Sequence, residues 1–225
     1  MLIEIPEVLP PADAERLCER LRCANFIDGR ATAGNLAESI KRNRELPVTE
    51  EWLAFGKEIC AALTANSLFN NFALPRRLML PIFSRYDKGM AYGAHSDEAI
   101  LGIEKPAQAV RNDLAMTLFL SPPSSYDGGE LSVETPVGPH AFKLPAGHAV
   151  VYPSHYLHEV RRVTRGTRLA AVTWIQSFVR DAERRAVLYE LGCASTKLRG
   201  EGAAHAEVNA INNVYHKLLR MWGMD

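Results

Sequence analysis

The spacing of apolar and polar positions predicts helices at both ends of the chain and a β-rich middle. The first predicted helix covers residues 10–22, and its apolar positions are Ala14, Leu17, Cys18 and Leu21. A polar run over residues 38–44 follows. A second helix is predicted to begin at Thr49, a residue type that caps helix N-termini. Its buried face is expected to contain Trp52, Phe55, Ile59 and Leu63.

Over residues 77–178 the pattern changes to short apolar or alternating runs that are separated by turn residues. Many short strands with frequent turns are typical of a β-sandwich or a closed barrel. One predicted strand covers residues 168–176, and side chains alternate between the two faces of a strand. One face of this strand therefore contains Arg168, Ala170, Val172 and Trp174. The other contains Leu169, Ala171, Thr173 and Ile175.

From Asp181 onward the chain is predicted to be helical again, with one helix to about residue 191 and another over residues 203–222. The apolar stripe of the last helix consists of Val208, Ile211, Tyr215, Leu218 and Trp222. We expect this stripe to pack on the β-rich core, with a contact between the subunits of a homodimer as the alternative. The chain thus divides into an N-terminal helical flank (1–76), a β core (77–180) and a C-terminal helical extension (181–225).

Composition narrows the class of protein. The 225 residues are 47% hydrophobic and 23% charged, which leaves room for one good-sized domain with appendages or at most two small ones. Lys+Arg and Asp+Glu balance at 26 each, with a pI of about 7.1, so no overall field draws the chain to nucleic acid or to an anionic membrane. The N-terminus lacks the pattern of a secretory signal, and no apolar stretch approaches the roughly 20 residues of a membrane span. We expect a cytoplasmic protein whose four cysteines are reduced and mostly buried.

His95 and Asp97 stand two residues apart, after a glycine-containing run over residues 86–92. In an extended strand the two side chains point to the same face, so an imidazole and a carboxylate converge as two ligands of a metal do. A surface histidine beside a surface aspartate is the alternative. The later run 149–160 supplies His158 as a third ligand. Two histidines and one carboxylate form the facial triad that suits non-haem Fe(II) and leaves coordination positions open.

Arg168 opens a mostly apolar strand face, where a guanidinium is costly unless it holds an anion. The planar fork of the guanidinium suits a carboxylate. A 2-oxo acid can chelate two of the open iron positions, and O2 can take the last. Arg168 then fits as the partner of the far carboxylate of 2-oxoglutarate.

The spacing of His95-Ser-Asp97, His158 and Arg168 resembles the H-x-D…H…R signature of Fe(II)/2-oxoglutarate-dependent dioxygenases. Over essentially the whole chain, the flanking runs are similar to those of the bacterial PKHD-type hydroxylases. These runs include Thr32-Ala-Gly34, Tyr126-Asp-Gly-Gly-Glu-Leu131, Lys143-Leu-Pro-Ala-Gly147, Leu157-His-Glu-Val160, Val163-Thr-Arg-Gly-Thr-Arg168, Trp174-Ile-Gln-Ser177 and Leu219-Arg-Met-Trp222. The resemblance implies a double-stranded β-helix, a cupin-like jelly roll with helices packed outside, whose dioxygenase core is residues 77–180.

The resemblance also implies roles for single residues. Iron is held by His95, Asp97 and His158, which with Arg168 form the catalytic set. Tyr86 matches a tyrosine that hydrogen-bonds 2-oxoglutarate in related prolyl hydroxylases, with an ordinary core position as the alternative. Trp174 matches a tryptophan that lines the cosubstrate pocket, again with a core position as the alternative. The family is also associated with L-ascorbate (vitamin C) as a reductant of the iron.

One run departs from the family pattern. Where the family is expected to have Arg-Thr-Asp-Leu-Ser, this chain has Arg111-Asn-Asp-Leu-Ala115, so a role for the family's hydroxyls at these positions is in doubt. Arg111 itself either faces the substrate or forms a buried salt bridge. His155 is expected at the surface or behind the metal ligands, with a role as a ligand as the alternative, and Tyr92 is expected in the pocket wall. Solvent-exposed positions are expected for His140, His148, Arg161, Arg162 and Arg165.

The implied reaction couples oxidative decarboxylation of 2-oxoglutarate, which gives succinate and CO2, to hydroxylation of a C–H bond in a peptide, amino acid or other small molecule. A demethylase of alkylated nucleic acid is an alternative, but the neutral charge and the 8% aromatic content argue against it. The other alternative is a cupin-like sensor that binds metal and a 2-oxo acid without turnover, although a pure metal sensor does not need Arg168. Because the histidine ligands must be neutral, metal loading is expected to fall as the pH drops through the histidine range.

Overall fold

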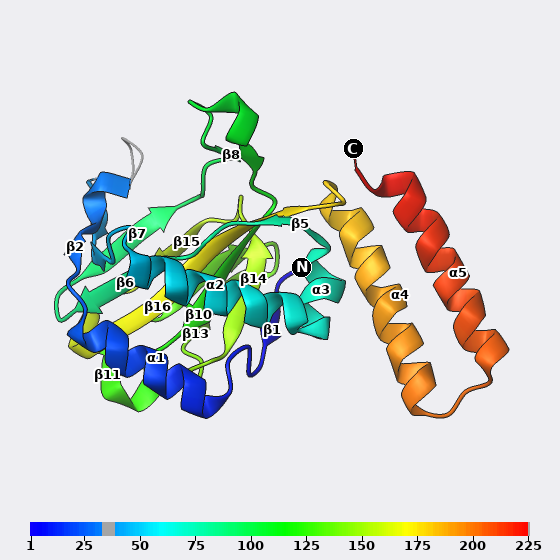
Figure 1. The fold of residues 1–225 in the computed structure, drawn as a ribbon, viewed down its shortest axis with the longest axis horizontal. Coiled ribbons are helices and arrows are strands. Elements are labelled where there is room, and N and C mark those ends of the chain that lie inside the picture. The colour runs from blue at the N-terminus through cyan, green and yellow to red at the C-terminus, as the bar shows by residue number, and fades with distance from the viewer. Residues whose placement is uncertain (33–38, 225) are drawn as a thin grey trace.

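The computed structural model describes residues 1–32 and 39–224, and its core consists of antiparallel β-sheets flanked by helices (Figure 1). The fold class predicted from the sequence, a jelly roll with helices at both ends, is confirmed. The helices are α1 (Pro11–Cys23), α2 (Glu50–Ala65), α3 (Ser67–Ala73), α4 (Ala182–Gly200) and α5 (His205–Trp222). The helix predicted at residues 10–22 is α1, and α2 begins after Thr49, whose hydroxyl accepts a hydrogen bond from the N–H of Trp52 at 3.1 Å.

Two antiparallel sheets face each other across the barrel. The major sheet has the order β1 (Ile3–Ile5), β14 (Ala149–Pro153), β10 (Leu114–Phe119), β16 (Val163–Ser177), β6 (Ile82–Asp87), β4 (Arg44–Glu45) and β2 (Ile27–Asp28). Two further strands, β5 (Pro75–Leu78) and β11 (Tyr126–Gly128), also pair with β16. The minor sheet has the order β13 (Gly138–Phe142), β12 (Leu131–Thr135), β15 (His158–Val160), β7 (Ala91–His95) and β3 (Lys41–Arg42). A small separate pair is formed by β8 (Ile100–Leu101) and β9 (Val110–Arg111).

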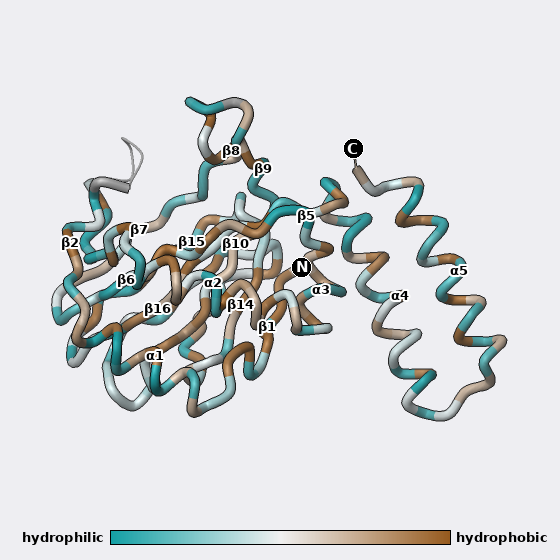
Figure 2. Tube along the Cα trace, viewed as in Figure 1, coloured by the Kyte–Doolittle hydropathy of each residue, from teal (hydrophilic) through white to brown (hydrophobic). Residues whose placement is uncertain are grey.

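The predicted alternation along β16 is confirmed. Leu169, Ala171 and Ile175 belong to the apolar core between the major sheet and the helices α1, α2 and α3. Arg168, Val172 and Trp174 face the interior of the barrel instead. Figure 2 shows the apolar residues concentrated on the barrel strands, as a core on both sides of one sheet requires.

The first 76 residues contribute strands as well as helices, which the sequence did not predict. In this segment β1 pairs with β14, β4 pairs with β6, and β3 pairs with β7. Residues 41–45 are polar throughout, so hydropathy has no alternation there that could predict a strand. This flank therefore completes the edges of both sheets. Ala33 and Gly34, part of the run that resembles the family, lie outside the described residues.

The C-terminal helices form a hairpin that stands beside the barrel (Figure 1). Asp181 caps α4, which continues nine residues beyond the predicted end at 191, and α5 packs against α4. The expectation that the apolar stripe of α5 packs on the β core is therefore wrong. Tyr215, Leu218 and Trp222 pack instead on a small cluster of Leu74, Val179 and Leu188, at the point where the hairpin meets the end of the barrel.

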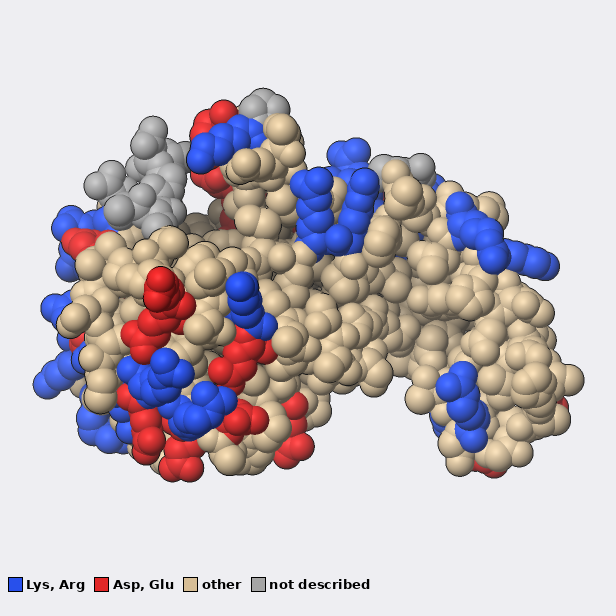
Figure 3. All heavy atoms as spheres, in the orientation of Figure 1, with Lys and Arg blue, Asp and Glu red and all other residues tan. Residues whose placement is uncertain are grey.

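The surface carries charges of both signs side by side, as Figure 3 shows for the face over α1 and α2. Arg16 pairs with Glu58 at 2.5 Å and Arg20 with Glu51 at 3.3 Å across these two helices. Among the described residues, no helix has the length and apolarity that a membrane span requires. All four cysteines are free, as predicted, but Cys23 and Cys193 are exposed, so the expectation of mostly buried thiols is wrong for these two.

Candidate active site

A cavity of about 570 Å³ opens between the two sheets and brings most of the predicted site residues together. Its apolar wall includes Ile82, Leu131, Val160 and Val172. Its polar lining includes Lys41, Asn43, Glu45, Ser84, Tyr86, Tyr92, His95, Asp97, Tyr152, His158, Arg168 and Trp174. A cavity of this size falls in the range of small-molecule and cofactor sites.

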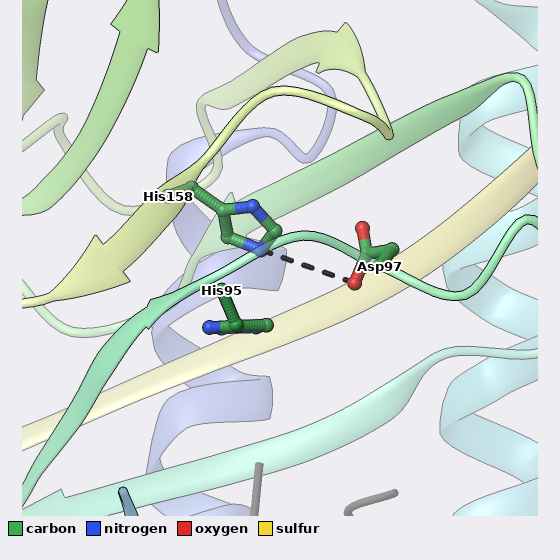
Figure 4. Close-up of side chains that lie close together, drawn as sticks. All are labelled: His95, Asp97 and His158. Atoms are coloured by element: carbon green, nitrogen blue, oxygen red, sulfur yellow. Dashed lines mark ion pairs between the residues drawn. The ribbon is translucent and has the colours of Figure 1, made fainter. Parts of the chain in front are cut away.

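His95, Asp97 and His158 meet at one point of this cavity, as Figure 4 shows. His95 ends β7 and His158 begins β15, and the two residues are direct cross-strand partners with ring centroids 4.3 Å apart. Asp97 lies beyond the end of β7, where its N–H donates to the carbonyl of Ser154 at 3.2 Å. Each residue offers a ligand atom within 4.8 Å of the others, and His158 Nε2 lies 3.9 Å from Asp97 Oδ1. This separation is compatible with three ligands around one ion.

The hydrogen bonds of the two imidazoles leave the correct nitrogen for a metal. His95 Nδ1 lies 2.8 Å from the carbonyl oxygen of Gly93, and His158 Nδ1 lies 3.0 Å from that of Tyr156. A carbonyl can only accept, so Nδ1 carries the proton in both rings and Nε2 keeps its lone pair. Asp97 Oδ2 is buried and has no hydrogen-bond partner among the described residues. The donor set therefore fits a divalent cation with mixed nitrogen and oxygen ligation.

Burial controls the ionisation of the triad. It raises the pKa of Asp97 to about 6, against the opposing effect of the neighbouring Trp174 and His95. Burial, together with the nearby His158, lowers the pKa of His95 to about 4. Burial also lowers the pKa of His158. The neutral forms of all three groups are thus favoured by burial.

Arg168 lies in the same cavity and is 1% exposed. Its guanidinium carbon lies 5.3 Å from the ring centroids of both Tyr86 and Phe119, which sandwich the cation between aromatic faces. Its Nε and Nη2 atoms have no acceptor among the described residues. A buried guanidinium with open donors is costly, and a carboxylate ligand removes that cost.

The aromatic residues of the site occupy distinct places. Tyr86 is 3% exposed beside Arg168, and burial raises its pKa to about 12, so its hydroxyl keeps its proton as a donor. Trp174 lines the cavity with a buried indole N–H that has no acceptor in the described chain. Tyr92 stacks on His95, with centroids 3.7 Å apart and planes inclined by 17°. Tyr92 is thus in the cavity wall, where the sequence predicted it.

The other candidates lie outside the triad. His155 and His140 are exposed, and His148 is half-buried. Arg111 forms an ion pair with Asp113 at 2.8 Å, the second of its two predicted alternatives. Arg161, Arg162 and Arg165 are exposed, as expected, and Arg165 pairs with Asp127 at 2.6 Å.

The polar cavity residues that sequence reasoning missed include Lys41, Asn43 and Glu45. They belong to the run that reads as an uninterrupted polar segment, with Arg42 and Arg44 between them. Alternate residues of this segment are buried and exposed, but all of them are polar. A pattern of hydropathy therefore does not distinguish the residues that line the cavity from those that face water.

Comparisons with known proteins agree with this geometry. The model of the 2OG-Fe(II) oxygenase superfamily matches residues 81–176, and that of the PKHD-type hydroxylase C-terminal domain matches residues 181–223. A PKHD-type hydroxylase of Bordetella pertussis is 44% identical over 226 residues, which cover 99% of either chain.

Solved structures share the fold at low identity. A Pseudomonas putida prolyl-4-hydroxylase has a TM-score of 0.55 and 21% identity, over 78% of this chain and 92% of its own. HygX from Streptomyces hygroscopicus, solved with nickel, 2-oxoglutarate and hygromycin B, has a TM-score of 0.52 and 15% identity, over 79% and 84%. Fold, site and full-length relatives agree, and the chain belongs to the PKHD-type hydroxylases of the 2OG-Fe(II) oxygenase superfamily.

Proposed function

We propose that this chain is a hydroxylase in which His95, Asp97 and His158 hold Fe(II) and Arg168 binds the far carboxylate of 2-oxoglutarate. One observation carries the proposal. Three possible metal ligands line the same cavity as a buried arginine, two of whose donor atoms have no acceptor among the described residues. The solved relative with nickel and 2-oxoglutarate bound supports the pairing of a metal with this cosubstrate.

Each residue has a defined task in this proposal. The carbonyls of Gly93 and Tyr156 hold the imidazoles with Nε2 toward the ion, and Asp97 supplies the negative charge. The bidentate fork of Arg168 and the hydroxyl of Tyr86 orient 2-oxoglutarate, while Trp174 borders the ligand set. Bound Fe(II) supplies the chemistry of O2 activation, with 2-oxoglutarate as co-reductant that leaves as succinate and CO2. The apolar wall of the cavity excludes water from the reacting groups.

The substrate class that we propose is a peptide, an amino acid or another small molecule whose C–H bond is hydroxylated. Residues 77–180 would form the catalytic core, with 1–76 and 181–225 as flanks. L-ascorbate would restore Fe(II) after turnovers that do not reach the substrate. Membership of the hydroxylase family and a cavity of small-molecule size support these assignments.

The test is carried out on the full chain under oxygen-free conditions. Fe(II) and 2-oxoglutarate together should produce the visible charge-transfer absorption of an iron-chelated 2-oxo acid. Admission of O2 should then consume 2-oxoglutarate and release an equal amount of succinate. A band without any consumption would make the protein a sensor that binds without turnover, and no band with folded protein would refute the proposed site.

A further inference from the structure

The polar segment before α2 forms one wall of the active-site cavity. Lys41, Asn43 and Glu45 are 5%, 4% and 4% exposed, whereas Arg42 and Arg44 between them are exposed. All three buried residues line the cavity that contains the triad. Neither the metal nor the cosubstrate in the proposed function uses them.

This wall is an ion pair held in place by neutral groups. Lys41 Nζ lies 2.6 Å from Glu45 Oε1, and Asn43 Nδ2 lies 3.4 Å from both Glu45 Oε1 and Ser84 Oγ. Lys41 pairs with Tyr92 in the minor sheet, and Glu45 pairs with Ser84 in the major sheet. The pair thus spans the two sheets and presents an ammonium beside a carboxylate to the interior.

The wall lies next to the iron-binding end of the cavity. Lys41 Nζ is 5.3 Å from the centroid of Tyr92, and Tyr92 stacks on His95. Arg168 lines the same cavity, and its guanidinium carbon lies 5.3 Å from the ring centroid of Tyr86. A ligand at Lys41 and Glu45 would therefore sit beside the metal without occupying the place of the cosubstrate.

A contact that spans the two sheets does not by itself require charged side chains. Two buried ions lose hydration, and an apolar pair of similar volume often stabilises a protein as well or better. An ion pair that faces a ligand cavity has a further use, because its two charges match a ligand with two opposite charges. The burial of the pair inside the cavity favours a small ligand over a chain that crosses the mouth.

We propose that Lys41 and Glu45 bind the zwitterionic head of an α-amino acid, with Lys41 on its carboxylate and Glu45 on its ammonium group. Asn43 and Ser84 position Glu45 for this contact. The inference rests on the proposed function and adds the head group of the primary substrate. The side chain of that amino acid would then extend toward the iron.

The test adds single L-amino acids to the oxygen-free complex of the full chain with Fe(II) and 2-oxoglutarate. At least one should perturb the charge-transfer band and accelerate consumption of 2-oxoglutarate when O2 enters. Its N-acetyl and its C-amide derivatives should each bind at least about tenfold more weakly, because each lacks one charge. If the band forms but no amino acid changes it, or if the blocked derivatives act equally well, the zwitterion proposal is wrong while the proposed function stands. If no band forms, both the zwitterion proposal and the proposed function are wrong.

Variants separate recognition from structure. Lys41→Met should keep the band and lose the response to the amino acid, whereas Arg42→Met, a neighbour on the exposed face of β3, should keep both. The exchange Lys41→Glu with Glu45→Lys retains an ion pair but inverts its polarity, so it should also lose the response at an unchanged unfolding temperature. An exchanged variant that responds like the wild type would overturn the proposal, and so would a Lys41→Met variant that folds but cannot form the band.

Discussion

At the scale of single residues, burial shifts the pKa values of the triad's carboxyl and imidazoles in opposite directions in the absence of metal. The pKa of Asp97 is raised to about 6 and that of His95 is lowered to about 4. A buried carboxyl favours its neutral form and a buried imidazole does the same. Asp97 is thus expected to take up a proton before His95 as the pH falls.

This order predicts the pH dependence of metal binding. Below about pH 6 the metal must displace the proton of Asp97, so the apparent Fe(II) affinity should fall about tenfold per pH unit. Titration against a chelator of known affinity under argon, from neutral to mildly acidic pH, measures this slope. The sequence instead predicted that metal affinity falls as the histidine ligands protonate. A midpoint of about 6.5, with two protons displaced per metal ion, would support that expectation over the present one.

Arg168 offers a second prediction at this scale. Arg168→Met should weaken 2-oxoglutarate binding by about 30-fold or more, because the cosubstrate loses a buried charged partner. Fe(II) binding should change little, since Arg168 is not a ligand. Titration of the charge-transfer band with 2-oxoglutarate measures the first effect and chelator competition the second.

The same variant has a structural control. Because Nε and Nη2 of Arg168 have no acceptor in the part of the chain that the structure describes, its removal should leave the free energy of unfolding of the ligand-free protein unchanged or higher. Arg168→Lys keeps the charge without the fork and should show an intermediate affinity. Equal losses of iron and cosubstrate binding in Arg168→Met would contradict its role as the carboxylate partner.

At the scale of elements, the turn between β11 and β12 supports the strand that carries Arg168. Gly129 has a φ of +67°, and a Cβ there would stand 3.1 Å from Cδ of Arg168 and 3.1 Å from a ring carbon of Tyr126. Such a contact is tighter than ordinary packing, and both side chains are held by their neighbours. A side chain at this turn would therefore press on Arg168, as well as on Val163 at 3.0 Å.

Gly129→Ala should therefore weaken 2-oxoglutarate binding as well as stability. Gly202→Ala is the matched control, since its φ is +75° but nothing lies within 4 Å of the added carbon. Both substitutions should cost about 1–3 kcal/mol in the free energy of unfolding because of the left-handed backbone. Only Gly129→Ala should raise the concentration of 2-oxoglutarate that half-saturates the band. Equal cosubstrate affinities in the two variants would show that the turn does not position Arg168.

The helices illustrate what a stripe of apolar residues can and cannot predict. The pattern of α5 correctly identified its buried side, but α5 packs on α4 and not on the barrel. Period 3.6 indicates which face of a helix is covered. It says nothing about what covers the face, because α4, the barrel and a second subunit are equally apolar partners.

At the scale of the whole molecule, the ligands should stabilise the fold, since both sheets contribute to their site. His95 and His158 belong to the minor sheet, and Arg168 belongs to the major sheet. Metal and cosubstrate should each stabilise the chain by about 2.7 kcal/mol at a concentration 100-fold above its own dissociation constant. For a chain of this size the unfolding temperature should rise by about 5–10 °C for each ligand.

Thermal unfolding without oxygen measures this shift. His158→Ala should abolish the part of the shift that depends on the metal, and Arg168→Met should abolish the part that 2-oxoglutarate adds. A full shift in His158→Ala would mean that the ion binds elsewhere on the molecule.

The sequence by itself determined the start of α2, the two faces of β16 and, to within one residue, the limits of α1. With the family resemblance it also predicted the class of fold and a candidate site of the triad with Arg168. Each of these depends on local periodicity or on residue types whose chemistry restricts their use. Only the tertiary structure decided that residues 41–45 contribute a strand to each sheet, that Arg111 pairs with Asp113, and that α5 covers α4. These depend on which distant segments meet, and a one-dimensional pattern of polar residues does not distinguish a side chain that faces a cavity from one that faces water.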